Sequence, residues 1–417
     1  MMRSLLNPIL LFFCITAQAQ PRPGDVFREY VWHNASGDCN GALRVGGKLD
    51  YRLTEAADDY RGRGMISPPF ELDLVHATRA ELVVEKMLCH GGTKGLRVSI
   101  NEHEAMILPE APGIPKPQAE YAHHFNTVVQ VDLSSLYPGT GNSFLFEVDT
   151  AGHWWPQNLV YGMILRVYYE EGQVTDRGKI SFPAPGDTLG TENRIRVEVP
   201  AGEMVNSIDL VGYYEDADLE GDGIYRQWHY AYHKGLIYDH IGTVNIAPFQ
   251  LNWNTEWIPD QQDEIMLAAF VHLKNGYTYM TEAIEDLTLD RPSYSVELCK
   301  PYMRPRQWFT RDGEFSERFR LTGDPSRIRE ARLLFRSWSP GYFNGIYINN
   351  FLVFIKEGPK YDYFLHGIPI ETFMLETGEN ILTTGMTPLY NGQMVHGVEI
   401  QWPGIMVLIK YDTRTHQ

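Results

Sequence analysis

The sequence predicts an all-β protein built from several sandwiches. Apolar side chains recur at every second position in many segments, for example at Phe70, Leu72 and Leu74, which places one side of each segment in a core. Clusters of Gly, Pro, Asn and Asp, such as residues 138–142, separate these segments and are typical of turns. No window of about 12 or more residues carries the apolar stripe of a helix.

The N-terminus has the features of a signal peptide over residues 1–19. Arg3 supplies a positive charge, residues 5–16 are mostly apolar, and the small residues Ala17 and Ala19 suit cleavage by a signal peptidase. No later segment approaches the roughly 20 apolar residues that a spanning helix needs. We therefore expect a secreted, periplasmic or cell-surface protein that does not insert into the membrane.

Net charge and cysteine usage restrict the possible partners. The 417-residue chain has a formal charge of −17 and no cluster of Lys or Arg, so it repels phosphate backbones and nucleic acid is not expected as a ligand. Of the cysteines beyond the signal peptide, Cys39 and Cys89 could form a disulfide in an oxidising compartment. The alternative is that these two and Cys299 are all buried thiols.

Two segments rich in Gly and Pro, residues 171–192 and 299–308, divide the chain into three regions. The predicted regions cover residues 21–172, 191–297 and 306–413. A chain of this length suits roughly two to four domains.

The first and third regions follow the same order of strands and turns. In each, a strand ends in an asparagine, Asn101 or Asn349, and a later Gly-containing turn ends in another, Asn142 or Asn380. This order resembles the jelly-roll domains of secreted carbohydrate-active proteins, including carbohydrate-binding modules. The resemblance implies two jelly-roll-like β-sandwiches and a carbohydrate ligand.

The middle region contains a W-x-T element at Trp253 and Thr255, followed by an I-x-L-x-A strand at residues 265–269. It resembles the bacterial Ig-like domains of exported proteins. The resemblance implies an Ig-like sandwich between the other two, with Trp253 and Trp257 in its core or at a strand edge.

An acidic loop in the middle region offers oxygen ligands at every second position, from Asp216 through Asp218 and Glu220 to Asp222. Calcium prefers several hard oxygens on a chain that can curl around the ion, so the spacing predicts a structural calcium site. Counted from Asp218, the twelfth position is His229 instead of the glutamate of an EF-hand, which speaks against a helix pair. A solvated acidic loop without an ion is the alternative.

His229 and His233 are four residues apart and could share a zinc ion on a helix. The neighbouring tyrosines and Gly235 favour strand or loop instead. We expect packed, hydrogen-bonded histidines.

Aromatic clusters give the second functional signal. Trp154 and Trp155 lie between strands of the first region, and Trp338 and Tyr342 lie in a Gly- and Pro-containing segment of the third. Exposed aromatic faces can stack against sugar rings, so these four residues are the predicted ligand-binding residues. The alternative is that they close the ends of sandwich cores.

These observations favour a non-catalytic binding or surface protein with a carbohydrate ligand. The chain contains no G-x-S-x-G, P-loop or dinucleotide-type glycine pattern. An enzyme acting on polysaccharide or glycoprotein (a glycosidase, lyase or glycoamidase) and a structural envelope scaffold remain alternatives. Acidic, His and Tyr side chains converging in one groove would favour the enzyme, whereas a shallow aromatic platform would favour binding.

Overall fold

The computed structural model describes residues 20–34, 42–45, 51–54, 65–66, 71–88, 94–149, 158–200, 204–305, 308–309, 314–338, 345–354, 363–384, 389–390, 393–394 and 399–413. Regular structure in these residues is β-strand, joined by three-residue 3₁₀ turns. The predicted all-β class is confirmed. The predicted signal peptide, Cys39 and Cys89 lie outside the described residues.

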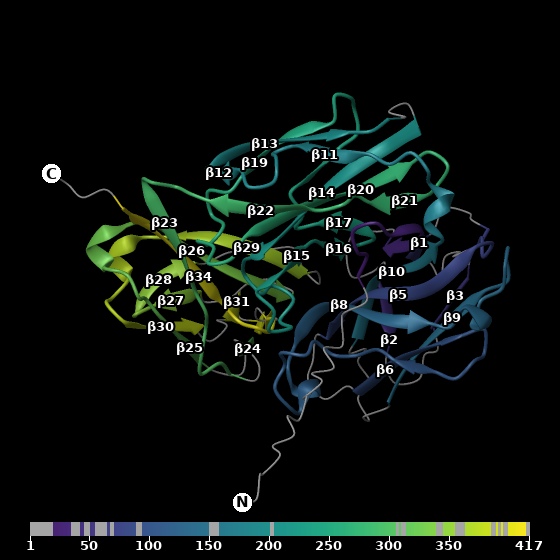
Figure 1. Ribbon diagram of the computed structural model, residues 1–417. Coiled ribbons are helices and arrows are strands. Elements are labelled where there is room, and N and C mark those ends of the chain that lie inside the picture. Colours follow the sequence, from purple (N-terminus) through teal and green to yellow (C-terminus); the bar gives the residue numbers. More distant parts are fainter. Residues whose placement is uncertain are drawn as a thin grey trace, which may run out of the picture.

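Two sheets form the N-terminal sandwich (Figure 1). Trp32 of the first sheet packs edge-on against Phe144 of the second, with ring centroids 5.1 Å apart, inside a shared apolar core. The first sheet has the order β1 (Val26–Asn34), β10 (Asn158–Tyr169), β5 (Ala77–Leu88) and β8 (His123–Val131), with the short strands β2 (Leu43–Val45) and β4 (Met65–Ile66) added. The second sheet has the order β3 (Tyr51–Thr54), β9 (Ser143–Asp149), β6 (Lys94–Ile100) and β7 (Met106–Ile107).

The C-terminal sandwich is built in the same way. Phe319 and Leu382 from one sheet meet Leu333 and Val407 from the other in its core. The first sheet runs β23 (Tyr294–Cys299), β34 (Met406–Asp412), β26 (Ile328–Trp338) and β29 (Tyr363–Ile370), with β33 (Glu399–Ile400) and β24 (Trp308–Phe309) at one end of β26. The second runs β25 (Phe315–Arg320), β30 (Glu379–Thr384), β27 (Ile346–Ile348) and β28 (Phe351–Phe354), and β31 (Leu389–Tyr390) pairs with β32 (Gln393–Met394).

The two sandwiches share one strand order, as the repeated sequence order predicts. In strand order, β1-β10-β5-β8 corresponds to β23-β34-β26-β29, and β3-β9-β6-β7 corresponds to β25-β30-β27-β28. The asparagines of the repeat make the same bond in each copy, from Asn101 Nδ2 to Asn142 Oδ1 at 2.9 Å and from Asn349 Nδ2 to Asn380 Oδ1 at 2.7 Å. The jelly-roll assignment and the boundaries of the three regions remain predictions.

The middle region joins the N-terminal sandwich edge to edge, because β21 pairs with β1 and makes one 13-stranded sheet. Its part of that sheet contains β14 (Val205–Glu215), β20 (Ile265–Leu273), β21 (Thr278–Met280), β22 (Ile284–Leu289), β12 (Thr188–Leu189), β15 (Arg226–His229) and β18 (Gly242–Val244). A three-stranded sheet of β11 (Lys179–Phe182), β13 (Glu192–Glu198) and β19 (Gln250–Asn254) and the hairpin of β16 (Ala231–His233) and β17 (Leu236–Tyr238) complete it.

The two tryptophans predicted for the core or strand edge of the middle region have different surroundings. Trp253 is buried in the core that the middle region shares with the N-terminal sandwich. Trp257 instead lies against the C-terminal sandwich, where the Arg332 guanidinium is 3.9 Å and the Lys410 ammonium 4.1 Å from its ring centroid. Trp257 therefore links the middle region to the C-terminal sandwich through cation–π contacts.

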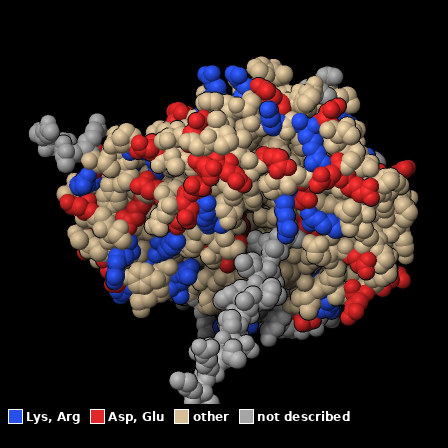
Figure 2. All heavy atoms as spheres, in the orientation of Figure 1, with Lys and Arg blue, Asp and Glu red and all other residues tan. Residues whose placement is uncertain are grey.

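None of the described helical segments has the length and apolar composition needed to cross a membrane. On the face shown in Figure 2, Lys and Arg side chains are interspersed with Asp and Glu. Cys299 is a buried free thiol, and burial raises its pKa well above the usual range.

Candidate functional site

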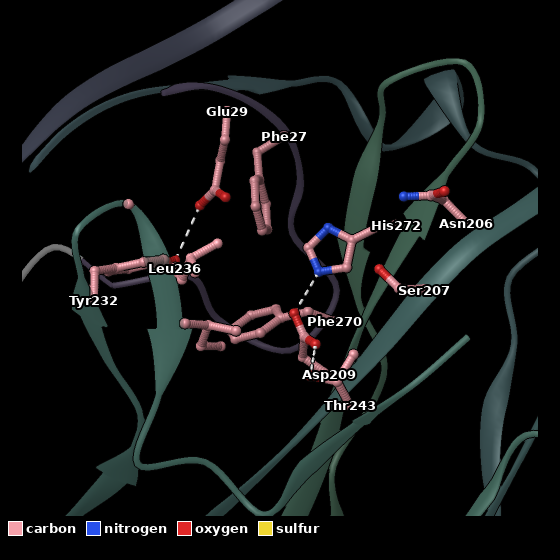
Figure 3. Close-up of a pocket in the computed structure, with 12 residues that line it drawn as sticks. Phe27, Glu29, Asn206, Ser207, Asp209, Tyr232, Leu236, Thr243, Phe270 and His272 are labelled. Atoms are coloured by element: carbon pink, nitrogen blue, oxygen red, sulfur yellow. Dashed lines mark hydrogen bonds and ion pairs between the residues drawn. The ribbon is translucent and has the colours of Figure 1, made fainter. Parts of the chain in front are cut away.

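A cavity of about 440 Å³ lies between the N-terminal sandwich and the middle region (Figure 3). Strands β1, β14, β18 and β20 and the β16–β17 hairpin form its walls. The polar lining residues are Glu29, Asn206, Ser207, Asp209, Thr243 and His272, and the others are Phe27, Tyr232, Gly235, Leu236, Ile237 and Phe270.

The pairing of β14 with β20 brings four lining residues together. Ser207 lies opposite His272 and Asp209 lies opposite Phe270 in this antiparallel pair. Because side chains alternate between the two faces of a strand, all four point to the same side of the sheet. Residues distant in sequence thereby form one continuous wall of the cavity.

The β16–β17 hairpin forms another wall, and its turn requires glycine. The two turn residues, Lys234 and Gly235, have φ angles of 53° and 77°, as in the two-residue turns that suit twisted hairpins. A Cβ atom on Gly235 would lie 2.6 Å from Cβ of His33 in β1, so a larger residue would push the hairpin away. This close approach keeps Tyr232 and Leu236 at the cavity.

Asp209 and His272 form an ion pair in the cavity wall, with 2.7 Å between Oδ2 and Nε2. Burial alone would raise the pKa of Asp209, but the hydrogen bond and charge of His272 lower it. Burial alone would lower the pKa of His272, but the bond to Asp209 raises it. Both shifts favour the charged form of the pair.

Both members of this pair are engaged with further protein groups. His272 Nδ1 lies 2.9 Å from the Thr278 hydroxyl, and Asp209 Oδ1 accepts a bond of 2.6 Å from the Thr243 hydroxyl. Proton transfer to a ligand would require one of these bonds to break. These bonds hold both side chains in a fixed orientation in the cavity wall.

Glu29 belongs to a row of charges that crosses three neighbouring strands. Arg166 on β10 lies opposite both Glu29 on β1 and Glu81 on β5, and it donates from Nε to Glu29 Oε1 at 2.8 Å. The Tyr232 hydroxyl also donates to Glu29 Oε1, at 3.1 Å. Within the described residues these contacts all fall on Oε1, which leaves Oε2 for a donor group of a ligand.

Next to the cavity, Glu85 of β5 ties the hairpin to both sandwiches. Its Oε1 lies 3.3 Å from His124 Nε2 and 3.1 Å from His233 Nδ1, and it accepts a bond of 2.5 Å from the Tyr363 hydroxyl. Burial alone would raise the pKa of Glu85, but the hydrogen bonds and charges of His124 and His233 lower it to about 2. The C-terminal sandwich thereby helps to hold the hairpin that forms the cavity wall.

Arg336 makes the complementary contact across the same junction. Its Nη1 lies 3.0 Å from His124 Nδ1 and donates to the Leu219 carbonyl oxygen at 3.0 Å, and its Nη2 donates to the Tyr238 hydroxyl. Burial and the positive charge of Arg336 lower the pKa of His124 to about 4. His124 is therefore neutral at neutral pH.

In the acidic loop predicted to hold calcium, backbone N–H groups donate to the loop's own carboxylates. Asp218 accepts backbone N–H bonds from Asp222 at 3.1 Å and Gly223 at 2.9 Å, and Asp222 accepts one from Ile224 at 2.8 Å. In the part of the chain that the structure describes, no group of three or more His, Cys, Asp or Glu could hold a metal ion.

Charge repulsion nevertheless remains within this loop. Burial and the nearby charges of Asp222 and Glu220 raise the pKa of Asp218 to about 7, and burial raises the pKa of Asp216. Calcium at Asp216, Asp218, Glu220 and Asp222 stays a prediction from the sequence.

Of the four predicted aromatic ligand-binding residues, Trp338 lies in the described part of the chain, and it does not line the cavity. Trp154, Trp155 and Tyr342 lie outside the described residues. Trp338 is only 6 % exposed and packs in a cluster with Tyr161 and Tyr363, which is the environment of a core residue and not of an open stacking face. Ligand binding by these four residues stays a prediction.

The residues that do form the site carried a weak sequence signal. Asp209 follows Ile208 and precedes Leu210, and Arg166 lies between Leu165 and Val167, so each is a charge inside an apolar strand. A buried charge needs a hydrogen-bonding or oppositely charged partner, so a charged residue inside an apolar strand could have been predicted to lie at a polar site. The partner itself depends on strand pairing and could not be named from the sequence.

The fold and cavity define an all-β protein of several sheets with a mixed polar and aromatic site. The sequence matches no family model, and no curated protein matches it significantly. Partial likenesses to solved structures include a β-porphyranase of glycoside hydrolase family 86 from the human gut bacterium Bacteroides plebeius, at 9% identity over 54% of this chain and 35% of that chain, with a TM-score of 0.24. This chain spans about a third of the length of the family 86 structures it matches.

Two further likenesses have TM-scores below 0.20. The fibronectin(III)-like modules of Clostridium thermocellum CbhA have 12% identity over 45% of this chain and 77% of theirs, with a TM-score of 0.18. N-glycanase F (PNGase F) has 9% identity over 93% of this chain and 96% of its own, with a TM-score of 0.19. Likenesses at this level do not define a function for this chain.

Proposed function

We propose that the chain is an exported, non-catalytic carbohydrate-binding protein whose sugar site is the cavity between β1, β14, β20 and the β16–β17 hairpin. The observation that carries this proposal is the cavity lining. Carboxylate, amide and hydroxyl groups from Glu29, Asn206 and Ser207 line the cavity together with the exposed apolar side chain of Leu236, while the rings of Phe27 and Phe270 behind them are buried. A sugar has the matching surface, with hydroxyl groups at its edge and apolar C–H groups on its faces.

The size and fixed geometry of the cavity also support binding. Its volume of about 440 Å³ falls within the range of roughly 300–1,000 Å³ found for small-molecule sites. Glu29 is held by Arg166 and Tyr232, and Asp209 is held by Thr243 and His272, so two acceptors are oriented before a ligand arrives. A preorganised site loses less entropy on binding.

The proposal is tested by screening the purified chain on a glycan array and titrating the best ligand by calorimetry. Glu29→Gln removes the negative charge from the acceptor, and Asn206→Ala removes an amide at the rim. Each variant should bind about tenfold or more weakly, which corresponds to about 1.4 kcal/mol. Ile107→Thr, an exposed position on β7 outside the cavity, is the matched control and should bind like the natural chain. Unchanged binding by Glu29→Gln, with its melting temperature preserved, would refute the cavity as the sugar site.

The same cavity supports a second candidate, an enzyme acting on polysaccharide or glycoprotein. Glu29, Asp209, Tyr232 and His272 converge in one cavity, which is the arrangement of acidic, His and Tyr side chains that would favour the enzyme, and most glycoside hydrolases use two carboxylates. Incubation of array ligands with the chain, followed by mass spectrometry, separates the two functions. Shortened or deglycosylated products would support the enzyme, and intact ligands would support binding.

A further inference from the structure

A second, smaller cavity of about 40 Å³ lies between the N-terminal sandwich and the acidic loop of the middle region. Its lining combines Asn126 and Val128 of β8 with residues of the acidic loop and of β15. A volume of this size has room for one ammonium group or a few water molecules, and it is far below the roughly 300–1,000 Å³ of small-molecule sites. The cavity therefore suits a small charged group and excludes a sugar.

The lining of this cavity is strongly acidic. It contains the carboxylates of Glu220 and Asp222 in the acidic loop and of Asp239, which follows β17. Among the described residues that line the cavity, none is Lys or Arg, and Nε2 of His229 is bound to a backbone carbonyl oxygen at 2.8 Å. Arg336 lies outside the lining, with its Nη2 3.6 Å from Glu220 Oε1. Negative charge is therefore in excess around the cavity.

Asp239 carries the largest unmet need for a positive partner. Its side chain is accessible from the cavity, yet among the described residues none donates a hydrogen bond to its carboxylate or forms an ion pair with it. The surrounding protein limits its hydration, and the negative charges of Glu220 and Asp216 act on it as well. A positive charge in the cavity would therefore stabilise this carboxylate.

Gln20 also lines the cavity, and it is the residue that follows the predicted cleavage site after Ala19. The segment that leads from it to β1 is fixed to the protein. Pro21 is buried, and the Met280 N–H of β21 donates to the Asp25 carbonyl oxygen at 3.0 Å. Residue 20 is thereby held at the acidic cavity, so the group that would enter it belongs to the chain itself.

We propose that this cavity is the binding site for the α-ammonium group of Gln20, which exists only after the signal peptide has been removed. Signal peptidase hydrolyses the Ala19–Gln20 peptide bond with one water molecule, so Ala19 leaves with a carboxylate and Gln20 gains a primary amine. An α-amino group is largely protonated at neutral pH. Its charge is then placed among the carboxylates of Glu220, Asp222 and Asp239, and processing strengthens the contact between β8 and the middle region. The inference shares with the proposed function only the expectation that the chain is exported.

The first test is the chemistry of the mature N-terminus. The chain exported from a bacterial host, analysed by intact mass and N-terminal sequencing, should begin at Gln20 with a free amine. A different first residue would overturn the inference. A glutamine that has cyclised to pyroglutamate with loss of ammonia would also overturn it, because the ring has no ammonium group.

The second test moves the ammonium group away from the cavity. Two glycines inserted between Ala19 and Gln20 keep the amine and every side chain but displace the charge by up to about 7 Å. With a chelator present, this insertion should raise the equilibrium constant for unfolding in urea about fivefold or more. In Asp239→Asn the insertion should change that constant by less than about twofold, because the acceptor is already neutral. Asp176→Asn, at an exposed position outside the cavity, is the matched control and should keep the full effect of the insertion.

An insertion that leaves the unfolding constant of the natural chain unchanged would overturn the inference, as would equal effects in Asp239→Asn and Asp176→Asn. An effect that appears only when calcium replaces the chelator would assign the cavity to a metal ion and also overturn it. Glu29→Gln should keep the full effect of the insertion, so failure of the sugar site and failure of the N-terminal site are read separately.

Discussion

Glu85 and Arg336 occupy equivalent positions in the two outer sandwiches, and they bind residues that are themselves equivalent. Ala80 of β5 pairs with Val131 of β8, and Ala331 of β26 pairs with Ile370 of β29, so the two alanines are equivalent. Glu85 and Arg336 each lie five residues further along the same strand. Glu85 accepts a bond from Tyr363 at 2.5 Å, and Arg336 lies 3.0 Å from His124. His124 and Tyr363 are both seven residues before the paired position on β8 or β29.

The junction therefore has the reciprocal contacts of a two-fold symmetric interface within one chain. At this equivalent position one copy has the negative Glu85 and the other the positive Arg336, whereas two identical subunits would have the same residue. A single fused chain can thus use complementary charge across a pseudo-symmetric junction, and the hairpin beside the cavity is held at this point through His233.

The first prediction is that Glu85 and Tyr363 are energetically coupled. Removing one partner of a buried charged network leaves the other without compensation, so Glu85→Gln should lower the free energy of unfolding by about 3 kcal/mol. The double variant with Tyr363→Phe should show an interaction energy of about 1–3 kcal/mol in a double-mutant cycle measured by urea unfolding. The exposed pair Arg97 and Asp149, 2.7 Å apart, is the control and should show less than about 1 kcal/mol. Additive effects at Glu85 and Tyr363 would contradict the junction described above.

The second prediction is that acid weakens this junction. The folded pKa of Glu85 is about 2, below its usual 4.5, so its contribution is complete above about pH 4.5 and is lost as the pH falls toward 2. The folded pKa of His124 is about 4, below its usual 6.5, so the folded state favours the neutral ring and loses stability as the pH falls from about 6.5 to 4. The melting temperature should fall over this range, and it should fall less in His124→Gln. An equal fall in both proteins would show that His124 does not carry the effect.

The third prediction concerns Asp218, whose pKa shift has the opposite sign. Its folded pKa of about 7 lies above the usual 3.8, so the folded state favours the protonated acid. Stability is therefore greatest below about pH 4 and is lost as the pH rises to about 7. Asp218→Asn removes the charge, but its single amide oxygen can keep only one of the two backbone N–H bonds, to Asp222 or to Gly223. The lost bond lowers stability at every pH, so stability relative to the natural chain should be higher near pH 8 than near pH 4 by at least about 1 kcal/mol. An equal effect of the substitution at the two pH values in urea titrations would contradict the raised pKa.

The fourth prediction tests the calcium site proposed from the sequence. If calcium binds the ionised loop, it offsets the burial and the repulsion that together raise the pKa of Asp218. Calcium should then raise the melting temperature of the natural chain near pH 8 relative to a chelator, and it should have no effect on Asp218→Asn combined with Asp222→Asn. Identical melting curves of the natural chain with calcium and with chelator would reject the site.

The fifth prediction is that the two turn asparagines are equally important. Asn142 accepts from the Tyr137 N–H and Asn380 accepts from the Glu376 N–H, at 2.9 and 2.8 Å, and both side chains are buried. Replacing either by alanine leaves buried backbone groups unsatisfied and should cost about 1–3 kcal/mol by urea unfolding. Asn252→Ala, at an exposed position on β19, should cost less than about 0.5 kcal/mol. A large cost at one turn asparagine and none at the other would show that the copies differ in their dependence on this bond.

The sequence was sufficient to predict the parts of the fold that depend on local pattern. Alternating apolar residues predicted strands, and the recurring asparagines predicted a repeat whose two copies have the same topology. His229 and His233 were expected to be packed and hydrogen-bonded, and they bond to the Tyr214 carbonyl oxygen and to Glu85. These features depend on short-range spacing, which a single sequence displays directly.

The candidate site could not be predicted in the same way. Glu29, Asp209 and Tyr232 come from different strands that meet only through long-range pairing, and no contiguous motif contains them. Trp338 was predicted to bind a ligand, with a place at the end of a sandwich core as the alternative, and it is buried at the junction between the sandwiches. In both cases the contact between distant segments, and not the residue type, determines whether a side chain meets a ligand.

Hydrogen–deuterium exchange with the best ligand of the glycan array tests the central claim most directly. Bound sugar should protect backbone amides in residues 205–209, 231–237 and 270–273, which contribute to the cavity walls. The Glu29→Gln variant should lose this protection under the same conditions. Protection confined to other segments, or none at saturating ligand, would contradict the assignment of the cavity as a carbohydrate site.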